Sequence, residues 1–245
     1  MEQNINKSNS EENIVKNKKE QIKKQKTKFE DLSKGQKFII IFNNCWSILF
    51  TLILLGFIIA KSIYGDTYNR MLSYICTILC YLAPILIQCI FRFRLNPSII
   101  TIYLSFITIS AFAGSCMRLY VLLPGLDKIQ HLTWGYIVCF FALFILCKTK
   151  EIDTMKPLTI ILFFLCFSLA TASIWEIFEF CGDTFLGQRA QGYPIDGITP
   201  VTDTMLDIIC HTGGTIIFTL HYCLDKFSGK NLGLKSVVND FKINY

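Results

Sequence analysis

The chain has 245 residues, of which 52% are hydrophobic and 14% are aromatic. This composition leaves too little polar surface for a soluble globular protein of this length. The formal net charge of +6 is unevenly spread, because lysines concentrate in residues 1–37 while several later stretches carry no charge at all. These features exclude an ordinary soluble domain and favour an integral membrane protein.

Six apolar stretches follow one another along the chain. A membrane-spanning helix needs roughly 20 mainly apolar residues. Five stretches meet this requirement without Asp, Glu, Lys or Arg: 38–60, 71–91, 98–117, 129–147 and 157–175. A sixth, 205–224, is apolar apart from Asp207, His211 and His221. We therefore expect an all-α fold, a polytopic membrane helix bundle with about six transmembrane helices.

The basic residues predict the orientation of these helices. Lys and Arg near helix ends favour the cytoplasmic side. Most of the 24 Lys and Arg residues lie in 1–37, 92–97, 148–156 and 225–245, which share one side of a six-helix bundle. We therefore expect an N-in/C-in protein of the cell (plasma/inner) membrane. Its parts would be a disordered basic cytoplasmic tail (1–37), a six-helix transmembrane domain (38–224) and a cytoplasmic C-terminal tail (225–245).

The N-terminal tail and the cysteines have plain explanations. The tail is rich in Lys, Asn, Glu and Gln, so we expect disorder and attraction to anionic membrane lipids. Aromatic residues do not interleave with its lysines, and nucleic acid is therefore not an expected partner. Nearly all of the 11 Cys lie in the apolar stretches without a C-x-x-C spacing, which indicates packing rather than disulfides or thiolate metal ligands.

Ionisable residues gather near the expected outer ends of the fourth, fifth and sixth helices. Such residues are costly within a membrane and mark functional sites. They are Asp127 and His131 in the fourth helix, Glu176 and Glu179 in the fifth, and Asp203, Asp207 and His211 in the sixth. Spacings of three and four place them on shared helix faces. Three helices therefore bring carboxylates and imidazoles to one depth on one side.

Small residues accompany the two histidines. Gly135 lies one turn after His131, and Gly213 and Gly214 follow His211. Glycines let helices approach closely in lipid. We therefore expect the last three helices to form a tight bundle with a polar pocket at its outer mouth.

Some of these residues have a structural alternative. Asp127 follows a Pro-Gly-Leu turn and is a candidate N-cap. Thr204 and Asp207 fit a capping box. His211 fits a core histidine that is bonded to a neighbouring carbonyl. These alternatives stay open beside the functional interpretation.

The paired glutamates fit a structural role less well. Glu176 and Glu179 lie toward the C-terminal end of the expected fifth helix, where the macrodipole disfavours negative charge. Neither capping nor solvation explains two acids one turn apart, so we favour function. Arg118, at the end of the third helix, either binds a lipid phosphate or extends to the membrane interface.

The residue types indicate two kinds of chemistry. Carboxylates and imidazoles converging from facing helices form metal sites in helix bundles. A set of O and N donors without thiolate suits a divalent Zn, Mn, Fe or Mg ion, and all seven residues are candidate ligands. Glu176 and Glu179 are the candidate general bases. The same groups can instead share protons.

Three motifs resemble those of a known family. The sequence has DKIQH at 127–131, EIFE at 176–179 and DTMLD at 203–207. From about residue 126 to 214 it resembles bacterial inner-membrane proteins of the YjdF type, which carry D-[KR]-x-x-H-F, E-x-x-E-W and W-D-x-x-x-D in this order. The flanking aromatic positions hold Leu132, Phe180 and Thr202 here. A weaker similarity is to VanZ-like membrane proteins. The resemblance implies a six-helix inner-membrane protein with a polar outer pocket.

Three functions are compatible with these features. The first is a metal-dependent membrane enzyme acting on a lipid or envelope precursor, and the second is a proton-coupled transporter. The third is a structural or regulatory membrane protein with a buried polar network. Transporters usually place coupling groups near the midplane and contain repeats, whereas these residues gather on one side. The polar loop 182–202 is long enough to act as a lid over the pocket.

Overall fold

The computed structural model describes residues 32–65, 71–91, 94–123, 125–188, 190–191, 198–229 and 231–244. Over these ranges the regular elements are helices, without a strand, which confirms the expected all-α class. The chain divides into a short unit, Met1–Phe38, and a large unit, Ile39–Tyr245. Most of the expected disordered tail 1–37 lies outside the described residues.

Helix α2 starts with a capping box. The backbone N–H of Ser33 donates to Gln36 Oε1 (3.1 Å), and the backbone N–H of Gln36 donates to Ser33 Oγ (3.2 Å). This reciprocal pair satisfies two donors that the helix itself leaves free. It fixes the beginning of α2 at Lys34.

The described helices match the expected stretches and extend beyond most of them. They are α2 (Lys34–Tyr64), α3 (Met71–Phe91), α4 (Pro97–Ile107) followed by the π-helix η2 (Thr108–Cys116), α5 (Leu119–Leu122), α6 (Leu126–Lys148), the short η3 (Glu151–Asp153), α7 (Pro157–Leu186), α8 (Pro200–Phe227) and α9 (Leu234–Asn244).

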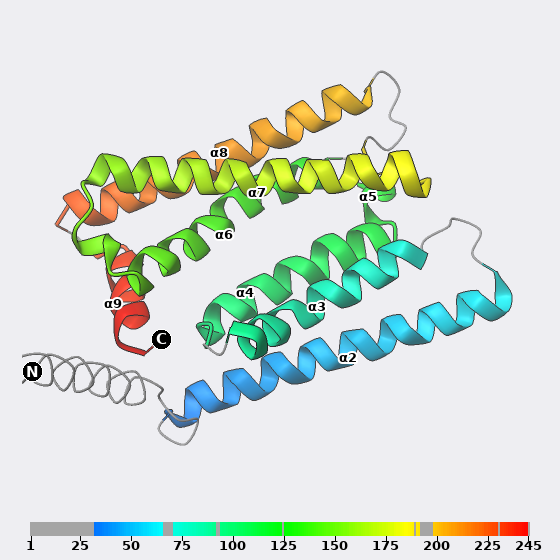
Figure 1. Ribbon diagram of the computed structural model, residues 1–245, viewed down its shortest axis with the longest axis horizontal. Helices are drawn as coiled ribbons and strands as arrows, with labels where there is room; N and C mark the ends of the chain where they lie inside the picture. Colours follow the sequence, from blue (N-terminus) through cyan, green and yellow to red (C-terminus); the bar gives the residue numbers. More distant parts are fainter. Residues whose placement is uncertain are drawn as a thin grey trace, which may run out of the picture. The chain divides into compact units, whose positions relative to one another are not determined.

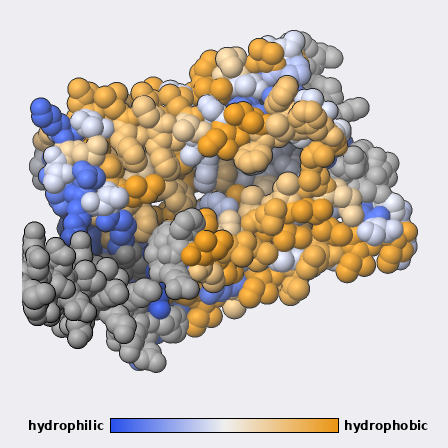
Figure 2. Space-filling view, in the orientation of Figure 1, coloured by the Kyte–Doolittle hydropathy of each residue, from blue (hydrophilic) through white to orange (hydrophobic). Residues whose placement is uncertain are grey.

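Five of these elements are long and apolar enough to cross a membrane, namely α2, α3, α4 with η2, α6 and α7. The sixth expected stretch lies within α8. Its 28 residues span about 42 Å, more than a hydrocarbon core of about 30 Å, but its acidic residues lower its hydropathy. Figure 2 shows hydrophobic side chains over most of the face in view. Such a surface is suited to lipid, and the protein is a polytopic helical membrane bundle.

The first half of the bundle consists of α2, α3 and α4 with η2, which lie side by side (Figure 1). Aromatic rings fill its core. The ring of Phe50 stacks on Tyr81 at 5.1 Å between centroids and meets Phe112 edge-on at 4.9 Å. Neutral polar groups join its helices, since Trp46 Nε1 donates to Thr108 Oγ1 (3.2 Å) and the Tyr81 hydroxyl lies 2.9 Å from the same oxygen.

The second half consists of α6, α7 and α8 (Figure 1). Two glycines bring α6 and α8 into backbone contact. A Cβ at Gly135 would lie 1.9 Å from the carbonyl oxygen of His211, and a Cβ at Gly214 would lie 1.9 Å from that of Leu132. The expectation of close helix approach is confirmed at these two positions. It is wrong for Gly213, which faces open space.

Helices α6 and α8 run in the same direction. Lys128 near the start of α6 contacts Asp207 near the start of α8, and Tyr136 further along α6 contacts His221 further along α8. Helix α7, which connects them, runs the opposite way (Figure 1). The beginnings of α6 and α8 therefore meet the end of α7, and we call this end of the second half the site end.

The expected C-terminal tail 225–245 contains ordered structure. Helix α8 continues to Phe227, and α9 folds back onto the bundle, where Phe241 packs on Phe144 with centroids 5.3 Å apart. The carboxylate of Asp225 accepts hydrogen bonds from the backbone N–H groups of Leu232 and Lys235. These contacts hold α9 at the end of the second half that lies opposite the site end.

Candidate functional site

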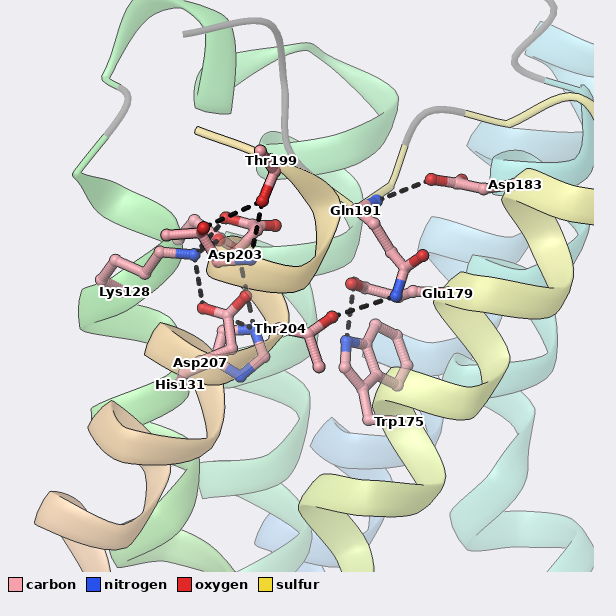
Figure 3. Close-up of polar contacts among 12 residues, drawn as sticks. Lys128, His131, Trp175, Glu179, Asp183, Gln191, Thr199, Asp203, Thr204 and Asp207 are labelled. Carbon is pink, nitrogen blue, oxygen red and sulfur yellow. Dashed lines mark hydrogen bonds and ion pairs between the residues drawn. The ribbon is translucent and has the colours of Figure 1, made fainter. Parts of the chain in front are cut away.

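A lysine stands at the centre of the acidic residues at the site end. Lys128 Nζ lies 3.0 Å from Asp127 Oδ2. It also lies 2.5 Å from Asp203 Oδ1 and 2.7 Å from Asp207 Oδ1 (Figure 3). Asp127 and Asp203 come from the first turns of α6 and α8, and Asp207 lies one turn further along α8, so the ammonium joins the two helices. We call these four residues the Lys128 cluster. Three carboxylates and one ammonium give the cluster a formal charge of two negative.

His131 lies beside this cluster. Its Nε2 is 3.7 Å from Asp127 Oδ1 and 3.6 Å from Asp207 Oδ1, which is too long for a hydrogen bond. Asp127, His131 and Asp207 each offer one ligand atom, and these atoms lie within 4.8 Å of one another. Among the described residues, these three form the group with metal-ligand spacing. Ligands at about 2.1 Å from a tetrahedral Zn ion stand about 3.4 Å apart. The two measured separations are close to that value.

The glutamates of α7 differ from each other. Glu176 is only 5% exposed, and neither of its carboxylate oxygens has a hydrogen-bond partner among the described residues. The hydroxyl of Thr204 is near, but not in hydrogen-bond geometry. Glu179 instead accepts a hydrogen bond from Trp175 Nε1 at 2.8 Å (Figure 3). Of the two glutamates, Glu176 is therefore the one with unused acceptor capacity.

The macrodipole argument for these glutamates does not hold. Helix α7 continues to Leu186, so Glu179 lies about two turns before its end. The dipole acts mainly within the last turn. The unsatisfied burial of Glu176 is the stronger reason to assign a function, because such a group is costly to bury. Glu176 also lies within electrostatic range of Asp203, Asp127 and Lys128.

Tyr120 approaches the site from α5. Burial raises the pKa of its phenol, and the nearby charges of Asp127, Glu179 and Asp207 raise this pKa further. Its ring occupies the space beside Gly114 of η2, where an added Cβ would lie 2.5 Å from the ring. The glycine in the π-helix thus makes room for a phenol that faces the acidic residues.

A second polar layer lies beneath the Lys128 cluster. Ser168 Oγ of α7 is 2.8 Å from His211 Nε2 and 2.5 Å from Thr215 Oγ1, and all three side chains are buried. His211 Nδ1 is buried without a partner. The expectation that His211 bonds to a neighbouring carbonyl is therefore wrong, because its partner is the Ser168 hydroxyl. Asp203, Asp207, His211 and Thr215, each four residues apart, form one buried polar stripe on α8.

Aromatic rings pack around α8 one turn after Thr215. Phe218 is fully buried, and its ring centroid lies 5.3 Å from that of Tyr136, 5.1 Å from that of Phe140 and 5.3 Å from that of Phe164. One turn after Thr215, Thr219 Oγ1 donates to the carbonyl oxygen of Thr215 at 2.8 Å, and the Tyr136 hydroxyl lies 2.8 Å from His221 Nδ1.

The capping alternatives are wrong for both aspartates. Gly125 is the N-cap of α6, and Asp127 lies in the first turn. Helix α8 begins at Pro200, with Thr199 as its N-cap, and Thr199 Oγ1 accepts from the backbone N–H of Thr202 at 3.2 Å. Asp207 lies two turns inside the helix and cannot cap it.

The described part of the 182–202 loop ties α7 to α8. Asp183 accepts hydrogen bonds from the backbone N–H groups of Ala190 (2.7 Å) and Gln191 (2.9 Å). The Gln191 amide then donates to Thr204 Oγ1 at 3.0 Å (Figure 3). Residues 189 and 192–197 lie outside the described residues, so the lid stays a prediction.

The structure thus brings Asp127, His131 and Asp207 together as a donor set. Asp203 pairs with Lys128, and Glu179 accepts a hydrogen bond from Trp175. Glu176 lies nearby, and His211 lies in the layer beneath. Sequence reasoning gave no role to Lys128, although the motif DKIQH contains it. It also missed Tyr120 and Ser168, which have no motif of their own.

The sequence matches the family described as "Predicted membrane protein (DUF2238)" over residues 44–226. The chain belongs to this family. The match confirms the resemblance to YjdF-type proteins, and the matched region contains the whole Lys128 cluster, His131, both glutamates and His211. Helix α9 lies beyond it.

Comparison with curated proteins and comparison with solved structures gave no match. The similarity to VanZ-like proteins receives no support from the family match.

Proposed function

We propose that the protein is a metal-dependent membrane enzyme acting on a lipid or envelope precursor at the outer face of the cell (plasma/inner) membrane. The distribution of Lys and Arg supports an N-in/C-in orientation, which places the site end outside. The observation that carries the proposal is the convergence of Asp127, His131 and Asp207 with metal-ligand spacing at this end.

The donor set suits a divalent cation. Two carboxylates and one imidazole are ligands for Zn, Mn, Fe or Mg ions, and three protein ligands leave a coordination position open, as in catalytic zinc sites. When bound, the cation would polarise the scissile group and lower the pKa of water. The cluster's formal charge of two negative matches the charge of such an ion.

Lys128 positions the ligands. It holds Asp127 through Oδ2, which leaves Oδ1 directed toward His131. It holds Asp207 through Oδ1, while Asp207 Oδ2 is buried without a hydrogen-bond partner. Asp127 therefore keeps Oδ1 free of the ammonium, whereas the Asp207 oxygen that faces His131 is the one that Lys128 holds. Hydrogen bonds from neighbouring groups orient the side chains that bind a metal ion, and Lys128 provides such bonds here.

Glu176 is our candidate general base. In a hydrolysis, water would add to the ester carbon or phosphorus while its proton passes to Glu176. The bond to the ester oxygen would break, and the proton would then pass from Glu176 to that oxygen. Glu176 suits this role because both of its oxygens lack partners among the described residues.

The two other functions fit the geometry less well. A proton path across the membrane would have to pass the aromatic rings that pack around Phe218. A purely structural network accounts for the ion pairs of Lys128. It does not account for Glu176, since burying an unsatisfied carboxyl destabilises a fold.

Metal content tests the proposal. Detergent-purified wild type, supplied with Zn or Mn, should bind about one equivalent per chain. The variants Asp207→Asn and His131→Gln should lose it, whereas Asp153→Asn should keep it. Asp153 is a matched control because it is exposed and pairs with Lys242 at the opposite end of the second half.

Folded wild type without metal after supplementation would overturn the metalloenzyme proposal. So would full metal content in both ligand variants. The residues would then form a link between helices and not a catalytic site.

A further inference from the structure

We propose that the ligand of this site carries a phosphate group and that Lys128 binds this phosphate once a divalent cation is in place. The inference rests on the metal site proposed above and names the substrate class of that site. It is carried by the position of Lys128 and by the charge of its cluster.

The charge of the cluster makes cation binding a precondition. With three carboxylates around one ammonium, an incoming phosphate would meet a formal charge of two negative. At such short range like charges repel strongly in a low-dielectric environment. A dication at Asp127, His131 and Asp207 brings the formal charge of the cluster to zero. Phosphate binding and cation binding should therefore be coupled.

Shared oxygens explain how Lys128 becomes available. An ammonium has three N–H donors, and the three aspartates occupy all of them. Asp207 Oδ1 lies 2.7 Å from Lys128 Nζ and 3.6 Å from His131 Nε2, so it faces both groups. A cation bound between Asp207 and His131 competes with the ammonium for this oxygen. One N–H of Lys128 is then released next to the open coordination position.

The accessibility of the cluster agrees with this arrangement. The side chain of Lys128 is 23% exposed, whereas those of Asp203 and Asp207 are 9% and 1% exposed. A ligand that approaches from the site end therefore meets the side chains of Lys128 and Asp127, the latter 30% exposed, before the two α8 carboxylates. Phosphate with Lys and a divalent cation is a common combination in proteins, because both neutralise its charge.

Apolar side chains flank the cluster on the lipid side. Ile129 of α6 and Val201 and Met205 of α8 are each at least half exposed, and they lie in the same turns as the aspartates. A phosphate attached to a hydrocarbon chain can contact these residues while its head reaches Lys128. The shared chemistry is phosphate, from a lipid headgroup or from a free phosphate ion.

The test uses the full chain in phosphatidylcholine nanodiscs, with Mn²⁺ as the cation. Inorganic phosphate is one probe, and phosphatidic acid included in the nanodisc is the other. Binding is followed by calorimetry and by the Mn²⁺-induced broadening of the ³¹P resonance. Wild type should bind phosphate only with Mn²⁺ present.

Variants of Lys128 then test its role. Lys128→Met should weaken phosphate binding roughly tenfold to a hundredfold when both proteins are compared at saturating Mn²⁺. Lys128→Arg should retain most of the affinity, because it keeps the charge. The exposed Lys156→Met at the other end of the second half should behave as wild type.

Reciprocity gives a test that needs no variant. Phosphate must tighten Mn²⁺ binding by the same factor by which Mn²⁺ tightens phosphate binding. Broadening in excess of that in empty nanodiscs with phosphatidic acid alone would identify a lipid headgroup, and the same excess with inorganic phosphate would identify a free phosphate.

Two outcomes overturn the inference in distinguishable ways. Mn²⁺ binding without any coupling to phosphate, or equal phosphate binding by folded Lys128→Met, would refute it and leave the metal site standing. Failure of Mn²⁺ to bind at Asp127, His131 and Asp207 would refute the metal site as well.

Discussion

The two halves of the bundle hold their helices together in different ways. In the first half, α2, α3 and α4 with η2 meet through stacked rings and neutral hydrogen bonds, such as those on Thr108. In the second half, α6 and α8 meet through backbone contact at Gly135 and Gly214 and through the ion pairs of Lys128. Among the described residues, every buried acidic or histidine side chain belongs to the second half or to its extension at Asp225.

The difference shows which polar groups require a functional explanation. The described helices of the first half are joined without a buried acid or histidine. Ionisable groups are expensive inside a membrane, so their concentration in one half is not explained by assembly alone. The second half therefore contains the candidate site. Substitutions in the first half serve as controls for substitutions in the second.

The largest effect should come from the central cation. Lys128→Met leaves three carboxylates together without a counterion, and breaking a buried pair in this way costs about 3–5 kcal/mol. The free energy of unfolding in mixed micelles measures it. Lys128→Met combined with Asp203→Asn should be less destabilised than the sum of the two single variants. A cost below about 1 kcal/mol would show that the cluster behaves as an exposed surface pair.

The glycine contact should give the next largest effect. Gly135→Ala places a Cβ against the carbonyl oxygen of His211, which forces α6 and α8 apart and should cost about 3 kcal/mol. Gly213→Ala and Gly56→Ala have open space and should be neutral or slightly stabilising. Thermal unfolding in detergent compares the three. Equal stability of all three variants would contradict the close approach of the helices.

A smaller loss is expected in the buried layer beneath the site. Ser168→Ala removes the partner of His211 Nε2 and should cost about 1–2 kcal/mol. Ser105→Ala is the matched variant in the first half, where the hydroxyl donates only to the carbonyl of Thr101 in its own helix. It should cost less than about 0.5 kcal/mol. Equal losses in both variants would mean that His211 finds another partner easily.

Hydropathy alone predicted the class of fold and placed most of the helices. A spanning helix must satisfy its own backbone and present apolar side chains to lipid, so both requirements are written in consecutive residues. Helix ends were predicted less well. Helix α7 extends past the apolar stretch to Leu186, through charged residues such as Glu176 that hydropathy counts against a spanning helix.

The site could be predicted only in part, for a similar reason. Spacing placed Asp127, His131 and Asp207 on suitable faces, but the partner of each group depends on how α6 and α8 pack. Lys128 carries no periodic signal, and its role depends on contacts with residues 75 and 79 positions away. Tyr120 reaches the site only because η2 ends in a turn at Arg118 with a left-handed backbone.

The smallest effect is expected from a control substitution in the first half. Thr108→Val removes the hydroxyl that accepts from Trp46 Nε1 and contacts the Tyr81 hydroxyl. Interhelical hydrogen bonds in membranes contribute about 0.6 kcal/mol on average, so the loss should be about 0.5–1 kcal/mol. The content of Zn or Mn should stay at the wild-type value, because Thr108 lies in the half that contains no buried acid among its described residues. If metal content falls together with stability, the two halves depend on each other, and the residues of the second half could no longer be interpreted by contrast with those of the first.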